Sequence, residues 1–239
     1  MIYNKPIINQ IDEISKFIPG WSSIDQLYSL FLLLYSMSYI KGNVIEIGSW
    51  CGKSSSILGL ASYLTNVEQV LCIDLFPNKT DWFQNIDGTY SFKTKCNDKQ
   101  YIACKKYSVW EKTFNDEFLS VYGEEEDLLN IFRKNMMRLE YNNIITPYKG
   151  DSSIIKDIVN KNFKCKFAFI DGDHDYEAVC KDIQNIEPYL VLGSWICFDD
   201  AFSTYTDVDC ALYNMIIENK SYTNCQQLTR KLFVAQKCG

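Results

Sequence analysis

The feature that most constrains the fold of this chain is a regular alternation of short apolar runs with helix-like stretches, from residue 43 onward. Strand-helix-strand order predicts a doubly wound α/β fold with a mostly parallel sheet and right-handed crossovers. The periodicity predicts strands at residues 43–47, 69–74, 143–148, 166–171, 194–199 and 231–236. It predicts helices near residues 54–64, 126–140, 152–160, 176–187 and 207–219.

The length and composition predict one domain over residues 1–239, because 239 residues that are 47% hydrophobic can form one sizeable core. Residues 1–42 form a predicted helical lead-in, with Ser22 or Ser23 as an N-cap. Residues 77–126 form a predicted insert after the second strand, because loops of about fifty residues are uncommon in compact domains.

Several features favour a cytoplasmic protein with no membrane partner. The N-terminus lacks the pattern of a signal peptide, and the longest apolar stretch, residues 27–40, is short for a membrane span. The ten cysteines contain no CxxC pair, which favours reduced, buried thiols. A net charge of −6 argues against nucleic acid as a partner, so a small molecule is the expected substrate. Homo-oligomerisation stays open.

A glycine turn joins the first strand to the next helix, in the segment VIEIGSWCGKSS at residues 44–55. The dinucleotide-binding pattern GxGxxG fails here, because Trp50 stands at its middle glycine. A phosphate-binding P-loop shares the ending Gly52-Lys53-Ser54, but its first glycine would fall on Ile47. A P-loop-like nucleotide-binding or hydrolysing module is therefore the main alternative function.

The pattern that fits is E-x-G-x-x-x-G, followed by CIDLF and by FIDGDHDYEAV. With these motifs the chain resembles the class I S-adenosylmethionine-dependent methyltransferases. It is most similar to a small bacterial group with an IDGDH-Y signature, which includes macrolide-sugar O-methyltransferases. The resemblance runs from about Ile18 to Asp200, outside the insert, and it departs at Leu192-Gly193-Ser194, where the family often has two glycines.

The resemblance implies a cofactor site for S-adenosylmethionine at successive strand ends. Asp74 ends the second strand, where a carboxylate can accept both ribose hydroxyls, and Asp151 would meet the adenine amine. Asp151 or Ser152 could equally serve only as a helix N-cap. The residues expected to contact the cofactor are Glu46, Gly48, Ser49, Gly52, Ser54, Asp74, Asp151, Ser152 and Asp171.

Two further strand ends carry Asp171 and the pair Asp199 and Asp200. Such hard oxygen ligands suit Mg²⁺, Mn²⁺ or Ca²⁺, and Mg²⁺ is expected. The alternative is that Asp171 contacts the charged end of the cofactor while Asp199 and Asp200 only terminate a strand. His174, the only histidine, is expected to act as general base beside Asp171, because a neutral imidazole can take a hydroxyl proton. The alternative is a structural histidine.

The insert is rich in aromatic residues and has a lysine-rich half. The insert could serve as a lid whose aromatics stack on an acceptor and whose lysines attract an anionic group. Alternatively, the aromatics could form a core of the insert itself. The expected function is divalent-metal-assisted O-methylation of a hydroxyl on a sugar, glycan or modified natural product. A non-catalytic cofactor-binding protein is a second alternative.

Overall fold

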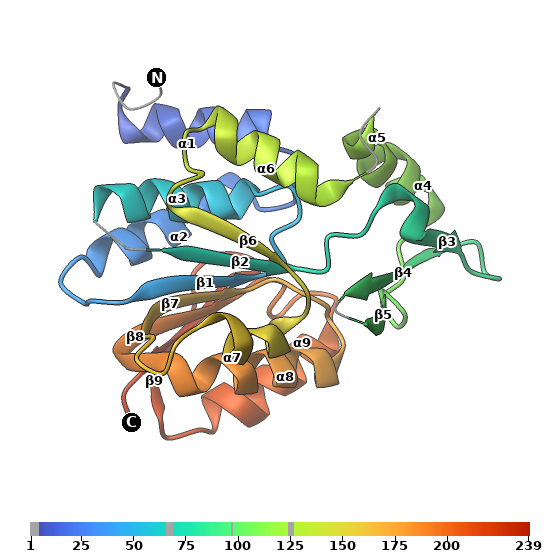
Figure 1. The fold of residues 1–239 in the computed structure, drawn as a ribbon. Helices are drawn as coiled ribbons and strands as arrows, with labels where there is room; N and C mark the ends of the chain where they lie inside the picture. Colours follow the sequence, from blue (N-terminus) through green and yellow to red (C-terminus); the bar gives the residue numbers. More distant parts are fainter. Residues whose placement is uncertain (1–4, 66–68, 97, 124–126) are drawn as a thin grey trace.

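A seven-stranded sheet organises the computed structural model, which describes residues 5–65, 69–96, 98–123 and 127–239 (Figure 1). The strand order is β6-β2-β1-β7-β8-β10-β9, and only β10 pairs antiparallel, with both of its neighbours. The strands are β1 (Asn43–Ile47), β2 (Val70–Asp74), β6 (Ile145–Lys149), β7 (Cys165–Ile170), β8 (Leu190–Phe198), β9 (Tyr222–Gln227) and β10 (Phe233–Lys237). The predicted doubly wound, mostly parallel fold is therefore confirmed.

Helices cover both faces of this sheet (Figure 1). One face carries α1 (Ile7–Phe17), α2 (Ile24–Ser36), α3 (Lys53–Leu64) and α6 (Leu128–Arg138). The other carries α7 (Ile155–Ile158), α8 (Tyr176–Ile186) and α9 (Thr206–Leu212). Short 3₁₀ turns lie at η2 (Lys79–Asp81), η4 (Ser152–Ile154) and η5 (Glu187–Tyr189), and π-helical turns at η3 (Phe114–Phe118) and η6 (Tyr213–Ile217).

The sheet divides the interior into two apolar clusters, because alternate strand residues point to opposite faces. Val44 and Phe167 belong to the cluster beneath α1, α2 and α3. Ile45 and Ala168 belong to the cluster beneath α8 and α9. Burial on both faces explains why the central strands read as nearly continuous apolar runs in the sequence.

All six predicted strands are present, with boundaries within four residues of those expected. The five predicted helices are present to the same accuracy when η4 is counted with α7, for residues 152–160, and η6 with α9, for residues 207–219. The lead-in forms α1 and α2, and Ser23 stands at the N-cap of α2 without a side-chain capping bond. Strand β9 was not predicted. Five of its six residues are exposed and polar or small, so the apolar pattern that marks a strand is missing there.

The insert forms its own small sheet, β3 (Trp82–Gln84), β4 (Tyr90–Cys96) and β5 (Lys99–Ala103), followed by α4 (Glu111–Thr113) and α5 (Leu119–Tyr122). Trp82 packs against Phe92, Phe114 and Phe118, so the insert has an aromatic core of its own. It lies at the carboxyl ends of the parallel strands (Figure 1). The last three positions predicted for it, 124–126, lie outside the described residues.

All ten cysteines are free, as expected, and six of them are buried. The expectation of burial is wrong for Cys210, Cys225 and Cys238, which are exposed. Among the described residues, no helix combines the length and the apolar character needed to cross a membrane.

Candidate functional site

The glycine turn after β1 lies directly against the end of β7. Gly48 has φ +83°, and a Cβ on it would stand 1.8 Å from the carbonyl oxygen of Asp171. Any side chain would therefore collide with the backbone, so this position requires glycine. Because β1 and β7 are adjacent and parallel, this close approach joins the predicted cofactor loop to the predicted catalytic loop.

Glu46 carries a fully buried carboxylate beneath this turn. Its Oε2 accepts hydrogen bonds from the hydroxyls of Ser49, at 2.7 Å, and of Ser55, and the Ser54 hydroxyl also interacts with the carboxylate. Burial raises the pKa of Glu46 despite these bonds. Its Oε1 is buried and has no hydrogen-bond partner among the described residues, so it is available to a donor that is absent from the chain.

Asp74 joins two loops at the end of β2. Its carboxylate accepts the backbone N–H of Trp50, at 2.9 Å, and of Phe76, at 2.6 Å. Burial raises the pKa of Asp74, although these N–H groups and Lys149 favour its charged form. The carboxylate thus fixes the glycine turn, and its expected contact with a ribose stays a prediction.

Asp151 and Ser152 follow β6. Asp151 caps η4 by accepting the N–H of Ser153 at 3.2 Å, as the N-cap alternative expected, and it pairs with Lys181. Burial opposes its charge, but Lys181 and Ser153 hold its pKa below the ordinary value. The buried Ser152 hydroxyl accepts from Asn185 at 2.8 Å and also interacts with Asp182. These contacts are compatible with cofactor binding and do not require it.

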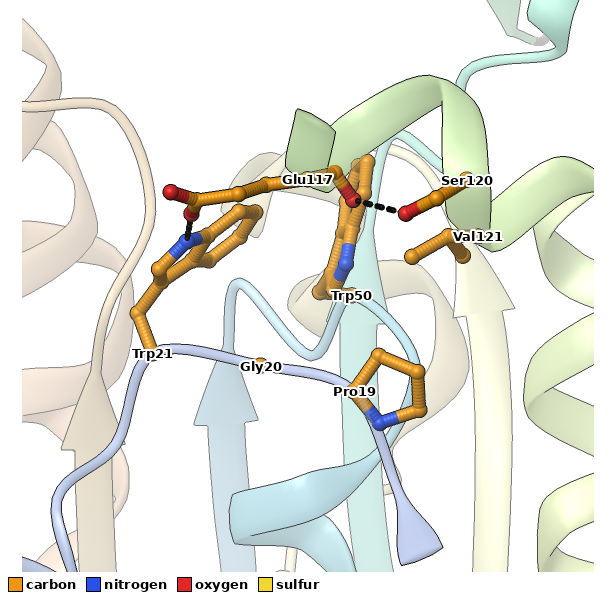
Figure 2. A pocket seen from close by; sticks show the side chains of 7 residues that line it. All are labelled: Pro19, Gly20, Trp21, Trp50, Glu117, Ser120 and Val121. Atoms are coloured by element: carbon orange, nitrogen blue, oxygen red, sulfur yellow. Dashed lines mark hydrogen bonds between the residues drawn. The ribbon is translucent and has the colours of Figure 1, made fainter. Parts of the chain in front are cut away.

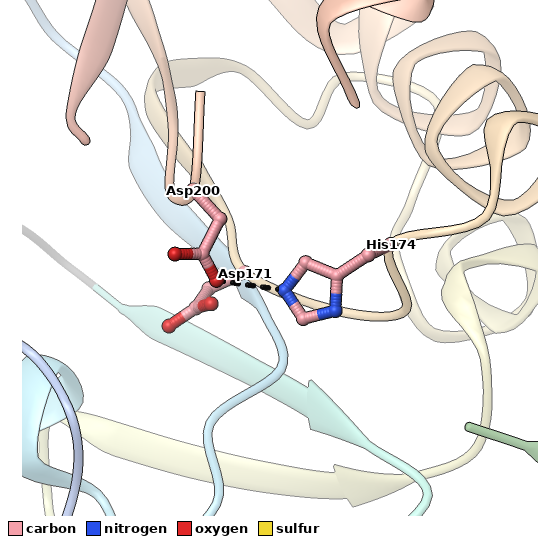
Figure 3. A group of neighbouring side chains, drawn as sticks. All are labelled: Asp171, His174 and Asp200. Atoms are coloured by element: carbon pink, nitrogen blue, oxygen red, sulfur yellow. Dashed lines mark hydrogen bonds and ion pairs between the residues drawn. The ribbon is translucent and has the colours of Figure 1, made fainter. Parts of the chain in front are cut away.

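Asp171, His174 and Asp200 converge at the ends of β7 and β8, with one ligand atom from each lying within 4.8 Å of the others (Figure 3). His174 Nε2 lies 2.8 Å from Asp200 Oδ2. Burial and the charges of Asp199 and Asp200 raise the pKa of Asp171 well above its ordinary value. Asp200 adopts φ +55°, a strained conformation for a non-glycine residue. That turn directs its side chain toward His174.

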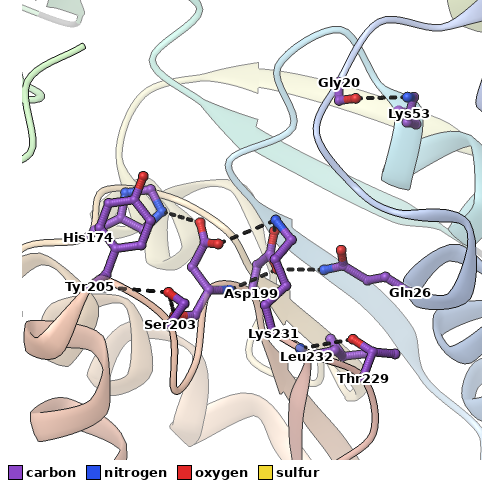
Figure 4. Close-up of polar contacts among 11 residues, drawn as sticks. Gly20, Gln26, Lys53, His174, Asp199, Ser203, Tyr205, Thr229, Lys231 and Leu232 are labelled. Atoms are coloured by element: carbon purple, nitrogen blue, oxygen red, sulfur yellow. Dashed lines mark hydrogen bonds and ion pairs between the residues drawn. The ribbon is translucent and has the colours of Figure 1, made fainter. Parts of the chain in front are cut away.

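Asp199 is held differently, by residues from distant parts of the chain (Figure 4). Its Oδ1 accepts the Gln26 amide at 2.6 Å, and its Oδ2 accepts the Lys231 ammonium at 2.9 Å. Lys231 also lies 3.3 Å from Asp200 Oδ1. Burial opposes the charge of Lys231, but Asp199, Asp171 and Asp200 together hold its pKa above the ordinary value.

Sequence reasoning missed both Gln26 and Lys231, because neither belongs to a motif. Gln26 offered one usable signal, as a polar residue buried within an otherwise apolar helix.

Two tyrosines enclose the imidazole of His174. The Tyr205 ring stacks on it at a centroid distance of 3.9 Å and an angle of 14°. Tyr107, from the insert, meets it edge-on at 6.4 Å and contacts Tyr205 at 5.0 Å. The neighbouring Lys106 forms an ion pair with Asp207 at 2.6 Å. The insert therefore reaches the candidate site through this corner as well as forming its own core.

A cavity of about 290 Å³ lies on the other side of the glycine turn (Figure 2). Its walls include the rings of Trp21 and Trp50, whose centroids are 5.5 Å apart, and Glu117 of the insert. Glu117 accepts the indole N–H of Trp21. The lead-in, the glycine turn and the insert thus line an open, largely apolar pocket with a carboxylate at its edge.

The pair of His174 and Asp200 is arranged for proton transfer. Burial opposes the charge of Asp200, but the hydrogen bond with His174 and the charge of Lys231 hold its pKa below the ordinary value. An ionised carboxylate can only accept, so when Nε2 donates to Asp200, Nδ1 is the ring nitrogen left to take a proton. Asp200 would stabilise the imidazolium that forms when Nδ1 takes a proton, as the acid of a catalytic triad does.

Comparisons with known proteins identify the family to which the chain belongs. A family model described as a methyltransferase domain matches residues 45–201. A search of curated proteins finds no match.

Solved structures with the same fold include the calicheamicin methyltransferase CalS11, at 14% identity and a TM-score of 0.62, covering 98% of this chain and 88% of that one. The O-methyltransferase NovP is 13% identical with a TM-score of 0.61, and the match covers 92% of this chain and 84% of that one. An O-methyltransferase from Bacillus cereus in complex with SAH is 13% identical with a TM-score of 0.55, and the match covers 97% of this chain and 89% of that one. At these identities the likeness shows the fold alone. The family model, however, spans more than half of the chain and contains the glycine turn, Asp171, His174 and Asp200, so the protein belongs to this methyltransferase family.

Proposed function

We propose that this protein transfers the methyl group of S-adenosylmethionine to a hydroxyl oxygen of a sugar or a modified natural product. The observation that carries the cofactor assignment is the buried, unpaired Oε1 of Glu46 beside the glycine turn. A carboxylate oxygen in that position calls for a cationic N–H donor, and the amino acid end of S-adenosylmethionine has one. TomG from Streptomyces achromogenes, of the same fold at 11% identity, was crystallised with SAM.

The remaining cofactor contacts follow from the strand ends. Asp74, Asp151 and Ser152 face the same edge as Glu46 and would hold the ribose and the adenine, while Ser49 and Ser54 support the Glu46 carboxylate. When bound, S-adenosylmethionine would supply an electrophilic methyl group on sulfur. The chain itself contributes positioning and removal of the acceptor proton.

His174 is the proposed base, through Nδ1, with Asp200 orienting the ring and Tyr205 stacked against it. In this proposal Tyr107 closes the acceptor side of the site from the insert, and the exposed Lys93, Lys95 and Lys99 could attract an anionic acceptor group. The proposal that the acceptor atom is an oxygen is supported by one structural neighbour in particular, because a CalS11 structure is described as a TDP-rhamnose 3'-O-methyltransferase.

The divalent cation, expected to be Mg²⁺, is part of this proposal. Asp171 and Asp200 would hold it, since their oxygens converge and hard oxygen donors suit this ion. His174 cannot be both a ligand and the base. When bound, the ion would stabilise negative charge on the acceptor oxygen. The Asp199 carboxylate, expected as a third ligand, accepts hydrogen bonds from Gln26 and Lys231.

The nucleotide-hydrolase alternative loses its main support, because Lys53, the lysine of the P-loop-like ending, donates to the carbonyl oxygen of Gly20 at 2.8 Å. Calorimetric titration with S-adenosylhomocysteine and with ATP tests the choice. Binding of the first alone is expected, and binding of ATP alone would overturn the proposal.

Turnover separates the enzyme from a non-catalytic cofactor-binding protein. Wild type and His174→Ala are incubated with S-adenosylmethionine and acceptors that include TDP-rhamnose and hydroxylated natural products, and S-adenosylhomocysteine release is measured. We expect release by wild type that depends on the acceptor. A protein that binds cofactor and releases nothing with any acceptor hydroxyl would argue for the non-catalytic role.

A further inference from the structure

Lys231 is placed to act as a counter-ion for the acidic site. It lies on the short connection from β9 to β10, and its side chain is only 15% exposed. The ammonium group contacts Asp199, which is 3% exposed, and Asp200, which is 16% exposed. A largely covered ammonium between two carboxylates is a specific arrangement, because long basic side chains usually keep their charge in water.

The neighbouring donors use the remaining oxygens of these two carboxylates. Gln26 donates to the second oxygen of Asp199, and His174 bonds the second oxygen of Asp200. All four oxygens therefore have N–H partners, of which only Lys231 carries a fixed positive charge. Asp171 adds a third carboxylate to this group without taking part in that ion pair.

A divalent cation bound to Asp200 would stand close to the Lys231 ammonium. Because His174 bonds Asp200 Oδ2, the oxygen left for an ion is Oδ1, which Lys231 contacts. Two like charges a few ångströms apart repel strongly in a partly buried site, so the ion and the ammonium compete for this oxygen. We propose that Lys231 is the resident cation of this site, and that a divalent cation binds to Asp171 and Asp200 only by displacing it. This proposal extends the proposed function and rests on it, because the divalent cation is part of that proposed function.

Titration with Mn²⁺, followed by the electron paramagnetic resonance of the free ion, tests this proposal in the full chain with S-adenosylhomocysteine present. Lys231→Met removes the ammonium and keeps a long apolar side chain, and Lys231→Arg keeps the charge. Because the competing charge is lost, Lys231→Met should bind Mn²⁺ at least about tenfold more tightly than wild type, while Lys231→Arg binds as weakly as wild type. Adding Asp200→Asn to Lys231→Met should remove the gain and so locate the ion.

Equal Mn²⁺ affinity of wild type and Lys231→Met, within about twofold, would overturn the competition, because a tenfold change corresponds to only about 1.4 kcal/mol and is readily resolved. A gain that survives Asp200→Asn would also overturn it, since the ion would then lie elsewhere. Thermal unfolding verifies the fold of each variant, and Lys231→Gln replaces Lys231→Met if that variant does not fold.

The readout is independent of methyl transfer. If Mn²⁺ binding follows the expected pattern and S-adenosylhomocysteine does not bind, the competition stands and the cofactor assignment fails. If the cofactor binds and methyl transfer occurs while the Lys231 variants leave Mn²⁺ affinity unchanged, the proposed function stands and the competition fails.

Discussion

The two halves of the carboxyl edge stabilise their buried carboxylates by different means. On the β1 and β2 side, Glu46 and Asp74 are bonded by hydroxyls and backbone N–H groups from the adjoining loops. On the β7 and β8 side, Asp199 and Asp200 depend on an ammonium, an amide and an imidazole, which come from separate parts of the chain. The first half is a hydrogen-bonded site built from the glycine turn and the end of the next strand, and the second is a charged cluster that residues distant in the sequence complete.

The largest expected effect lies in the charged half. His174→Ala should lower kcat by about 10² to 10⁴-fold, the usual contribution of a positioned base, and the loss should shrink at high pH because hydroxide can replace it. Cofactor affinity, measured by calorimetry with S-adenosylhomocysteine, should stay within about twofold. A folded variant that keeps more than about half of the wild-type kcat at neutral pH would make His174 structural.

A smaller effect is expected in the hydrogen-bonded half. Asp74→Ala removes an acceptor of two backbone N–H groups and a proposed ribose ligand, so S-adenosylhomocysteine binding should weaken by about 1.5–3 kcal/mol. Asp74→Asn, which keeps one acceptor oxygen, is the matched control and should lose less. Unchanged affinity in a folded Asp74→Ala protein would remove Asp74 from the cofactor site and weaken the contrast between the halves.

The Tyr205 ring offers a subtler test of how the charged half is ordered. Tyr205→Ala removes the ring that stacks on His174, an interaction worth about 0.5–1.5 kcal/mol, so kcat should fall by roughly two- to tenfold. The pH profile of kcat should change as well, because the ring no longer holds the imidazole against Asp200. Tyr205→Phe keeps the ring and should behave as wild type. Equal losses in both variants would assign the effect to the hydroxyl.

The smallest effect on methyl transfer is expected at Asp182, which lies in α8 near Gly172 and Ser152, beneath the two halves. Burial raises the pKa of Asp182 to about 7, although the Ser152 hydroxyl favours its charged form. Below about pH 4 the carboxyl is protonated in both the folded and unfolded states. As the pH rises toward 7 only the unfolded state ionises, so stability falls through this window.

Asp182→Asn should remove that loss of stability, while kcat stays within about twofold because Asp182 touches no proposed reactant. Urea unfolding at several pH values measures the free energy of unfolding and hence its slope against pH. Asp157→Asn, at an exposed position of α7, is the control and should leave the slope as in wild type. An Asp182→Asn protein with the wild-type slope would show that Asp182 is ionised in the folded state.

The contrast between the halves also explains what could be predicted from the sequence. Glu46 and Gly48 belong to one strand-turn-helix motif, and Asp74 ends the next strand. Their convergence therefore follows from the order of the elements along the chain. The positions of Asp171, His174 and Asp200 could be predicted for the same reason. Tyr205 follows β8 closely, but its stacking depends on the path of the loop, which no local pattern encodes.

Other features depended on contacts between distant residues. Gln26 lies 173 positions from Asp199, and Lys231 lies 32 positions away on a strand connection whose first strand, β9, is polar and exposed. Strand prediction from apolar alternation fails for such an edge strand, and the approach of its lysine to Asp199 then cannot be foreseen. In the insert, the aromatic residues suggested both a core and a lid, and the sequence alone could not choose.

The attachment of Asp199 to both Gln26 and Lys231 has a consequence for the order of assembly during translation. Gln26 is made before β1 and Lys231 after β9, and contacts of a sequence separation as high as the 173 positions between Gln26 and Asp199 form late in folding. A nascent chain that has reached β8 already contains the whole glycine turn and Glu46. Its acidic cluster still lacks the compensating ammonium until the β9–β10 hairpin has emerged and paired with β8. Asp199 therefore gains its full set of partners only after that hairpin has folded.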